Sequence, residues 1–328
     1  MSWFSKQDKR IALVIKDYVI RYVEAKQTNL RSIVSYGERY LPPGVIHNGK
    51  IIDRETLLFT LEECIETWKL KRKKIFFLVP ESSVIVRTNE VEPQIPADEI
   101  KGHLYLELGE TIHLPFENPV IDFSLIEETD QGKKVILVAA PEATVQQYIE
   151  LLEEVKLRPV VADIASLSLC RLLNKVGFEY EQEHLLVLNV DLNHVNTTIF
   201  HKDIPIFSRN IKMKTNYEQW EVQAGEEGEK LVWAADEDID VHLREAVNEI
   251  VRVADFYRFS LQQGGEAVTR VLITGDYPQL EKIETMLKSR FEIPVEILNR
   301  ELFVSRGKKG LSINYFELIG LAMKKEVQ

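Results

Sequence analysis

The chain has 328 residues, enough for two domains, and its 45% apolar and 28% charged residues are ordinary for a globular protein. A formal net charge of −11 argues against sequence-independent nucleic-acid binding, which normally needs a basic surface. No apolar run reaches membrane-spanning length and no secretory apolar segment is present, so we expect a cytoplasmic protein.

The first half of the chain alternates predicted strands and helices. The runs IALVI and VIRYVEA, separated by a short turn, predict a β-hairpin, and SIVSYGERYL predicts a third strand. Residues 55–70 have the period of an amphipathic helix. The continuous apolar run KIFFLVP predicts a strand covered on both faces, and we expect SSVIVRTNEV to pair with it.

Residues 93–140 differ in composition from the residues before them. A short helix is expected between prolines, then a loop rich in Pro and Asn, then strands that end with KKVILVAA. A helix is predicted to begin at Pro141, because Pro suits the first turn of a helix. A strand follows and leads into a second helix, which is predicted to end at Gly177, because Gly is common just after a helix end.

The second half opens with another strand, turn and strand, HLLVLNVDLNHVNTTIF. When the two hairpins are aligned, Val14–Asp17 falls on Asp191–His194. A repeated hairpin followed by helices predicts two similar α/β halves that face each other across a cleft, which is an actin-like architecture. The acidic segment 215–240 is expected to be irregular or partly strand-like, and a last helix is predicted at about 312–325.

Four stretches, taken in order, resemble the PilM family of actin-like type IV pilus assembly proteins. They are IPADEIKGHLYLELGETIHLPFENPVIDFSLIE, VAAPEATVQQYIELLEEVKLRPVVADIASLSLCRLL, NEIVRVADFYRF, and VLITGDYPQLEKIETML with IPVEIL and YFELIGLAM. The resemblance implies an α/β, actin-like (ASKHA) fold with domain I at 8–182 and domain II, including the last helix, at 183–328. It also implies a small α+β subdomain inserted in domain I at about 92–140.

The resemblance further implies partners and a location. Members of the family sit at the cytoplasmic, inner face of the plasma membrane and bind a short N-terminal cytoplasmic peptide of a PilN-like membrane protein. Many hold ATP and Mg²⁺ between the two domains. A pilus assembly ATPase is a further expected partner, whereas nucleic acid is not.

The expected ATP site departs from the family pattern. The first hairpin of such proteins carries Asp-x-Gly-Ser, in which the Asp orients Mg²⁺-bound water and the small residues admit phosphate. The matching positions are assigned to Val14, Lys16 and Asp17, while Asp191 is retained in the second hairpin. We predict a degraded nucleotide cleft without metal or cofactor, made by Lys16, Asp17, Arg21, Asp191, Asn193, Asn196, Gly275 and Asp276.

Apolar residues of the insert are candidates for peptide binding. We expect a groove between the insert and the strands IFFLV and VIVRT, into which a peptide docks by strand addition or through side-chain pockets. The alternative is that these residues form the core of the insert. The candidates are Ile100, Leu104, Leu106, Phe116 and Val86.

Two basic stretches stand apart from these motifs. The run KLKRKK, residues 69–74, is the densest, and MSWFSKQDKR places Trp3 and Phe4 near Lys and Arg. Runs of charge usually face water. The alternative for both stretches is contact with an anionic lipid surface.

These features favour an adaptor of a type IV pilus-like or DNA-uptake (competence) machine. It would dock the PilN-like peptide, associate with the membrane through that partner, and not hydrolyse ATP. One alternative is an active actin-like ATPase or sugar-kinase relative, and another is the cytoplasmic part of a secretion-system assembly protein. No GxSxG, Walker A or HExxH motif is present.

Overall fold

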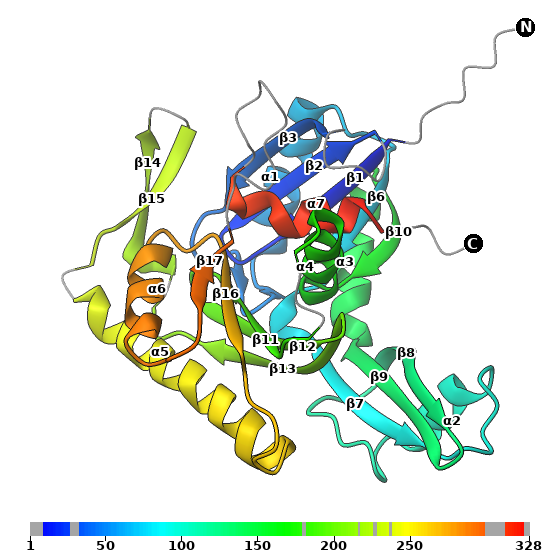
Figure 1. Cartoon of the computed structure of the whole chain (residues 1–328). Helices are drawn as coiled ribbons and strands as arrows, with labels where there is room; N and C mark the ends of the chain where they lie inside the picture. The colour runs from blue at the N-terminus through cyan, green and yellow to red at the C-terminus, as the bar shows by residue number, and fades with distance from the viewer. Residues whose placement is uncertain are drawn as a thin grey trace, which may run out of the picture.

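The structure is a computed structural model that describes residues 9–26, 33–178, 182–215, 217–225, 228–235, 238–298 and 312–324. Two large mixed sheets form its framework (Figure 1). The first is five-stranded, with the order β10 (Arg158–Asp163), β6 (Lys74–Leu78), β1 (Arg10–Ile15), β2 (Val19–Ala25) and β3 (Ile33–Tyr40).

The first sheet is covered on both faces, which explains its continuous apolar strands. Because side chains alternate along a strand, Ile11 and Leu13 of β1 join one core cluster while Ala12 and Val14 join another. The first cluster includes α1 (Arg54–Trp68) and α3 (Glu142–Glu154). The second includes residues of α7 (Phe316–Ala322), next to α4 (Ala165–Val176).

The second sheet is eight-stranded and runs from the second domain into the insert. Its order is β17 (Val295–Ile297), β16 (Arg270–Gly275), β11 (Leu185–Val190), β12 (His194–His201), β13 (Ile204–Lys212), β7 (Ile85–Val91), β9 (Gly132–Pro141) and β8 (Pro119–Thr129). Helices α5 (Ile239–Phe256) and α6 (Leu280–Lys288) pack beside its domain II strands (Figure 1).

The predicted pairing of SSVIVRTNEV with KIFFLVP is wrong. Strand β6 already has β1 and β10 as parallel neighbours, so it has no free edge. Strand β7 instead pairs with β9, and through Phe207 and Arg87 with β13. Together with α2 (Ile100–Leu106), strands β7, β8 and β9 form the projecting subdomain at the lower right of Figure 1.

The last helix, predicted as part of domain II, lies on the first sheet, and its Phe316 and Ile319 also join the core of domain II. Helix α7 is buried along its whole length, against α4, β1 and β2. Gly320 lets α7 pack closely against α4, because a Cβ at this position would lie 1.9 Å from the carbonyl oxygen of Ser168 in α4. Arg10 fixes the end of the segment, since its Nη1 donates to the carbonyl of Lys324 at 2.8 Å.

Two short hairpins complete the described fold, β4 (Ile46–His47) with β5 (Lys50–Ile51) and β14 (Trp220–Gly225) with β15 (Gly228–Trp233). The β14–β15 hairpin falls within the acidic segment that was expected to be irregular or partly strand-like. Residues 1–8, with Trp3 and Phe4, lie outside the described residues. Within the described ranges, no helix is long and apolar enough to cross a bilayer.

Candidate functional site

The β1–β2 and β11–β12 hairpins meet at the boundary between the two sheets. Each closes on a matching backbone hydrogen bond, from Lys16 N to Val19 O at 2.9 Å and from Asp191 N to His194 O at 2.8 Å. These bonds show that Lys16 and Asp191 occupy equivalent positions in the two hairpins. The alignment of Val14 with Asp191 was therefore wrong by two residues, because the first hairpin has no glycine to mark its turn.

The Lys16 ammonium lies among three carboxylates from the other side of the cleft and from α7. Its Nζ is 2.7 Å from Asp191 Oδ1, 2.9 Å from Glu317 Oε1 and 3.8 Å from Asp276 Oδ2. Glu317 also accepts a hydrogen bond at 3.3 Å from the Asn189 amide of β11. One lysine thus joins the first sheet, the second sheet and the last helix.

Burial and charge together set the protonation of this cluster. Burial alone would lower the pKa of Lys16, but Asp191, Asp276 and Glu317 outweigh it and raise that pKa. Burial raises the pKa of Asp191 against the effect of Lys16, whereas for Asp276 the effect of burial is outweighed by Lys16 and Arg21, which lower its pKa. The surrounding carboxylates therefore hold Lys16 in its protonated, cationic form.

A second buried set of polar groups surrounds Asp276. Both the Tyr18 hydroxyl and the Arg21 guanidinium donate to its carboxylate. Arg21 is only 1% exposed, and its Nε donates to Glu38 of β3 at 2.8 Å. The predicted cleft residues Arg21 and Asp276 are thus brought together, and their side chains satisfy each other's charge and hydrogen bonds.

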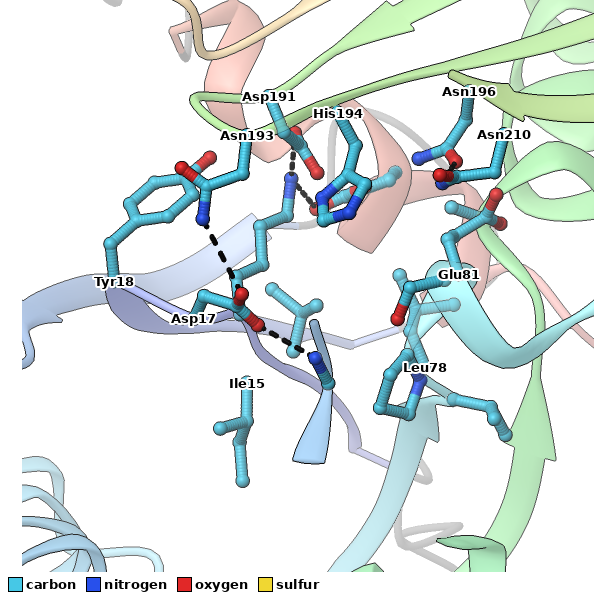
Figure 2. A pocket seen from close by; sticks show the side chains of 18 residues that line it. Ile15, Asp17, Tyr18, Leu78, Glu81, Asp191, Asn193, His194, Asn196 and Asn210 are labelled. Carbon is cyan, nitrogen blue, oxygen red and sulfur yellow. Dashed lines mark hydrogen bonds and ion pairs between the residues drawn. The ribbon is translucent and has the colours of Figure 1, made fainter. Parts of the chain in front are cut away.

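The Asp17 carboxylate is held by the turn between β4 and β5. It accepts from the backbone N–H groups of Asn48 at 2.6 Å and Gly49 at 2.9 Å, in the turn between β4 and β5. The Asn193 amide donates to it from the second hairpin at 3.4 Å. Figure 2 shows Asp17 below Asn193 and beside Tyr18, so this side chain also ties the two halves together.

The space left in the cleft is small. A cavity of about 50 Å³ remains between the two hairpins, Pro80, Glu81 and the start of α4. Ligand pockets for small molecules usually measure about 300–1,000 Å³, so this cavity has room for a few waters only. Asn196 lines it and accepts from the Asn210 amide.

Gly275 has a packing role. Its φ is +116°, and a Cβ would lie 2.2 Å from Val190 O of the neighbouring strand. Just beyond it an open depression of about 750 Å³ is lined by Asp276, Tyr277 and Pro278. This depression also bears the carboxylates of Glu38, Glu229, Glu281 and Glu296 and the ammonium of Lys230.

Three residues of the cleft were missed by the sequence reading, namely Tyr18, Glu81 and Glu317. Glu317 is a single acid within the otherwise apolar FELIGLA helix, and a buried charge normally has a partner, which is a usable signal. Glu81 follows a buried parallel strand at the sheet edge where sites form, and its Oε1 accepts from Ser166 N at 3.2 Å. Nothing in the sequence apart from its place in the turn indicates that Tyr18 belongs to the cleft.

The peptide-binding candidates are spread over the subdomain. Ile100 and Leu104 are 0% and 1% exposed and pack with Val91, Ile121 and Leu137, so they belong to the core of the insert. Phe116 packs against the same cluster, while Leu106 is 77% exposed. Val86 is buried in a different cluster with Ile136 and Ile164. These five residues do not form one groove.

A groove does lie on the other face of the β8–β9 hairpin. Helix α2 covers the face that carries Val135 and Leu137, and the alternate residues Ile136 and Val138 line a groove of about 510 Å³. Its other wall contains Ile164 and Leu167, at the beginning of α4. The remaining lining residues include Val79, Val120, Asp122, Ser124, Ala140, Ala162, Asp163, Ile204, Pro205, Lys101 and Lys324.

Comparison with known proteins identifies the family. A family model for the type IV pilus assembly protein PilM matches residues 13–326. The chain belongs to the PilM family. A solved structure, "PilM-PilN type IV pilus biogenesis complex", superposes with a TM-score of 0.75 at 18% identity, covering 96% of this chain and 98% of that one.

Two further structures share the fold of this PilM family member. The EutJ ethanolamine utilization protein of Carboxydothermus hydrogenoformans gives a TM-score of 0.53 at 8% identity, covering 96% of this chain and 89% of that one. A Bacteroides thetaiotaomicron protein with an actin-like ATPase fold and unknown function gives 0.50 at 10% identity, with coverages of 97% and 98%. The predicted actin-like α/β fold and the PilM resemblance are confirmed.

Proposed function

We propose that this protein is a PilM-type scaffold of a type IV pilus-like machine in which side chains, rather than ATP, join the two domains. The observation that carries the proposal is the position of Lys16. Its ammonium stands at the hairpin position equivalent to Asp191 and contacts the carboxylates of Asp191 and Glu317 at 2.7 and 2.9 Å. A permanent cation therefore fills the place where a relative would hold a nucleotide and its metal.

The charge pattern supports this reading. A nucleotide phosphate needs N–H groups or cations that are free to bind it. In this cleft Lys16 and Arg21 are both paired with carboxylates, and Asp17 occupies the backbone N–H groups of the Asn48–Gly49 turn. Binding of Mg-ATP would require these pairs to separate inside a buried region, which is unfavourable.

Calorimetric titration with Mg-ATP tests the proposal. We expect no heat of binding, and no rise in the melting temperature at millimolar Mg-ATP, because a ligand that binds only the folded state would stabilise it by mass action. A micromolar dissociation constant that is lost in Asp191→Ala would instead support the active ATPase and contradict the proposal. A protein with a known nucleotide affinity serves as the positive control.

The groove between the β8–β9 hairpin and α4 is the proposed docking site for the N-terminal peptide of a PilN-like membrane protein. Support comes from the similar PilM-PilN complex and from the lining of the groove by Val120, Ile136, Val138 and Ile164. Strand β8 is the last strand of its sheet, so its outer edge is available for addition of an extended peptide.

A pair of matched substitutions tests the groove. Val120 is 40% exposed within the groove, and Leu106 is 77% exposed on α2, so a glutamate at either position leaves the core intact. With a fluorescent PilN-like N-terminal peptide, Val120→Glu is expected to weaken binding at least about tenfold, since a charge is placed in an apolar site. Leu106→Glu is the control and should bind like the wild type. Equal affinities for both variants would exclude this groove.

Through that partner the protein would be held at the inner face of the plasma membrane, in a pilus or DNA-uptake system. Co-fractionation with membranes in cells that contain or lack the partner gene is the direct measurement. Loss of the membrane fraction in the deletion strain is expected if the peptide is the main tether.

A further inference from the structure

We propose that an exposed basic face at one end of the first sheet contacts the surface of an anionic phospholipid bilayer. The basic face is defined as Lys71, Arg72, Lys73, Lys156 and Arg158, all of them exposed. This surface lies at the start of β10, whereas the peptide groove includes Ala162 and Asp163 at its end. The inference therefore does not depend on the proposed peptide site.

The fold brings two distant loops together to make this face. Strands β6 and β10 are parallel neighbours, with Arg158 in register with Lys74, so the loops that precede them lie at the same end of the sheet. Two hydrogen bonds hold the loops side by side, from Arg72 N to Lys156 O at 2.7 Å and from Arg158 N to Lys73 O at 2.9 Å. The KLKRKK run is thus half of a larger surface.

Further basic residues border the face. Strand β1 begins and β2 ends at the same end of the sheet, since Arg10 is in register with Ala25. The exposed residues Lys9, Lys26, Lys69 and Lys74 therefore lie around it. Two acidic residues border the face, and both are paired with basic residues outside it: Glu24 with Lys9 at 2.9 Å and Glu154 with Arg54 at 2.5 Å. Burial opposes the lowering of the pKa of Glu24, to which Lys73 contributes, and Lys156 contributes, after Arg54, to the lowering of the pKa of Glu154.

The face contrasts with the charge of the whole chain. A net charge of −11 repels the molecule from an anionic bilayer, so only a local excess of positive charge can bring it close, and then in one orientation. Among the described residues, Lys71, Arg72, Lys73, Lys156 and Arg158 have no carboxylate within ion-pair distance. Their charge is available to a partner.

The chemistry of the face fits lipid better than nucleic acid. Its core consists of three lysines and two arginines on two turns, without aromatic side chains among residues 69–74 or 155–158 for stacking on bases. Lysines on flexible stems suit a diffuse anionic surface, to which each basic residue adds attraction within a Debye length.

Vesicle flotation of the full chain tests the proposal. We expect binding to vesicles of mixed phosphatidylcholine and phosphatidylglycerol, no binding to phosphatidylcholine alone, and loss of binding at high salt. The variant Lys71→Glu/Arg72→Glu/Lys73→Glu should bind at least about tenfold more weakly. The control, Lys202→Glu/Lys230→Glu/Arg258→Glu, makes the same charge change at exposed residues of domain II and should keep wild-type binding.

A second variant, Lys156→Glu/Arg158→Glu, lies on the other loop and replaces the first if that variant does not fold. Equal binding by the face variants and the control would overturn the proposal, as would failure of the wild type to bind anionic vesicles. Binding of duplex DNA with loss in the same variants, but no vesicle binding, would assign the face to nucleic acid and also overturn it.

Discussion

Lys16 Nζ lies 2.7 Å from Asp191 Oδ1, and the two residues occupy equivalent positions in the two repeated hairpins. The two sides of the cleft therefore carry opposite charges at matching places and attract each other directly.

Removal of the Lys16 ammonium should reveal how much it contributes to the free energy of unfolding. Lys16→Ala leaves Asp191, Asp276 and Glu317 facing one another in a buried region, and removing one partner of a buried ion pair destabilises by about 3–5 kcal/mol. Urea unfolding measures this loss. Lys50→Ala, an exposed residue of β5, should change the free energy of unfolding by less than about 0.5 kcal/mol. Equal losses in both would show that Lys16 makes no special contribution.

The Tyr18 hydroxyl gives a smaller, separable effect. Tyr18 is 2% exposed and its hydroxyl donates to Asp276, so Tyr18→Phe should destabilise by about 1.5–3 kcal/mol, the value for hydrogen bonds to charged groups. Tyr36→Phe is the matched control, because Tyr36 is 56% exposed. The melting temperatures of the two variants give the comparison.

Gly275 should tolerate no side chain. Gly275→Ala would place a Cβ at a φ of +116° and 2.2 Å from Val190 O, between two central strands, so a loss of more than about 3 kcal/mol is expected. Gly102, in helix α2, has open space around it, and Gly102→Ala should stabilise by about 0.5–1 kcal/mol. Chemical unfolding of both variants checks the contrast, and a mild effect at Gly275 would contradict the packing role.

Glu81 should make stability depend on pH. Burial, opposed by the Ser166 N–H, raises the pKa of Glu81 from 4.5 to about 7. The folded state thus binds the proton more tightly than the unfolded state, so the stability from this group is present below about pH 4.5 and falls as the pH rises towards 7. Because Glu81 is half-buried, the free energy of unfolding that is lost as the pH rises towards 7 should be about 1–2 kcal/mol.

Glu81→Gln removes the titrating group and tests this directly. Its free energy of unfolding should fall less between pH 5 and 7 than that of the wild type, a range set by the pKa shift of Glu81. Glu142→Gln, in the exposed first turn of α3, is the control and should keep the wild-type slope. Parallel profiles for the wild type and Glu81→Gln would contradict the assignment.

The sequence predicted the repeated design because both hairpins are strongly apolar and of similar length. The register of the repeat was misjudged by two residues, since Lys16, Asp17 and Tyr18 contain no glycine that marks the turn. The place of β7 was missed because an apolar strand pattern indicates burial but not which edge is free. Helix α7 was assigned to domain II by its position in the chain, whereas Gly320 and the apolar residues around Glu317 allow it to pack on the first sheet as well.

The cleft was predicted in outline only. The residue types at Lys16, Asp17 and Asp276 predict that phosphate or base contacts are weakened, yet they could not show that Lys16, Asp191 and Asp276 contact one another. That knowledge depends on contacts between residues far apart in the chain, such as Tyr18 and Asp276, which are separated by 258 positions. The core positions Ile100 and Leu104 were taken as groove candidates because exposure cannot be read from an amphipathic pattern alone.

Helix α7 has a consequence for the order in which the protein is made. The first sheet is laid down early, from Arg10 onwards, but one of its faces is closed by Phe316–Ala322. On the ribosome this face stays open while the whole second domain is synthesised. An N-terminal domain usually folds as it emerges, whereas this one must wait for its closing helix. A nascent chain halted after the second domain should therefore recruit chaperones until α7 is supplied.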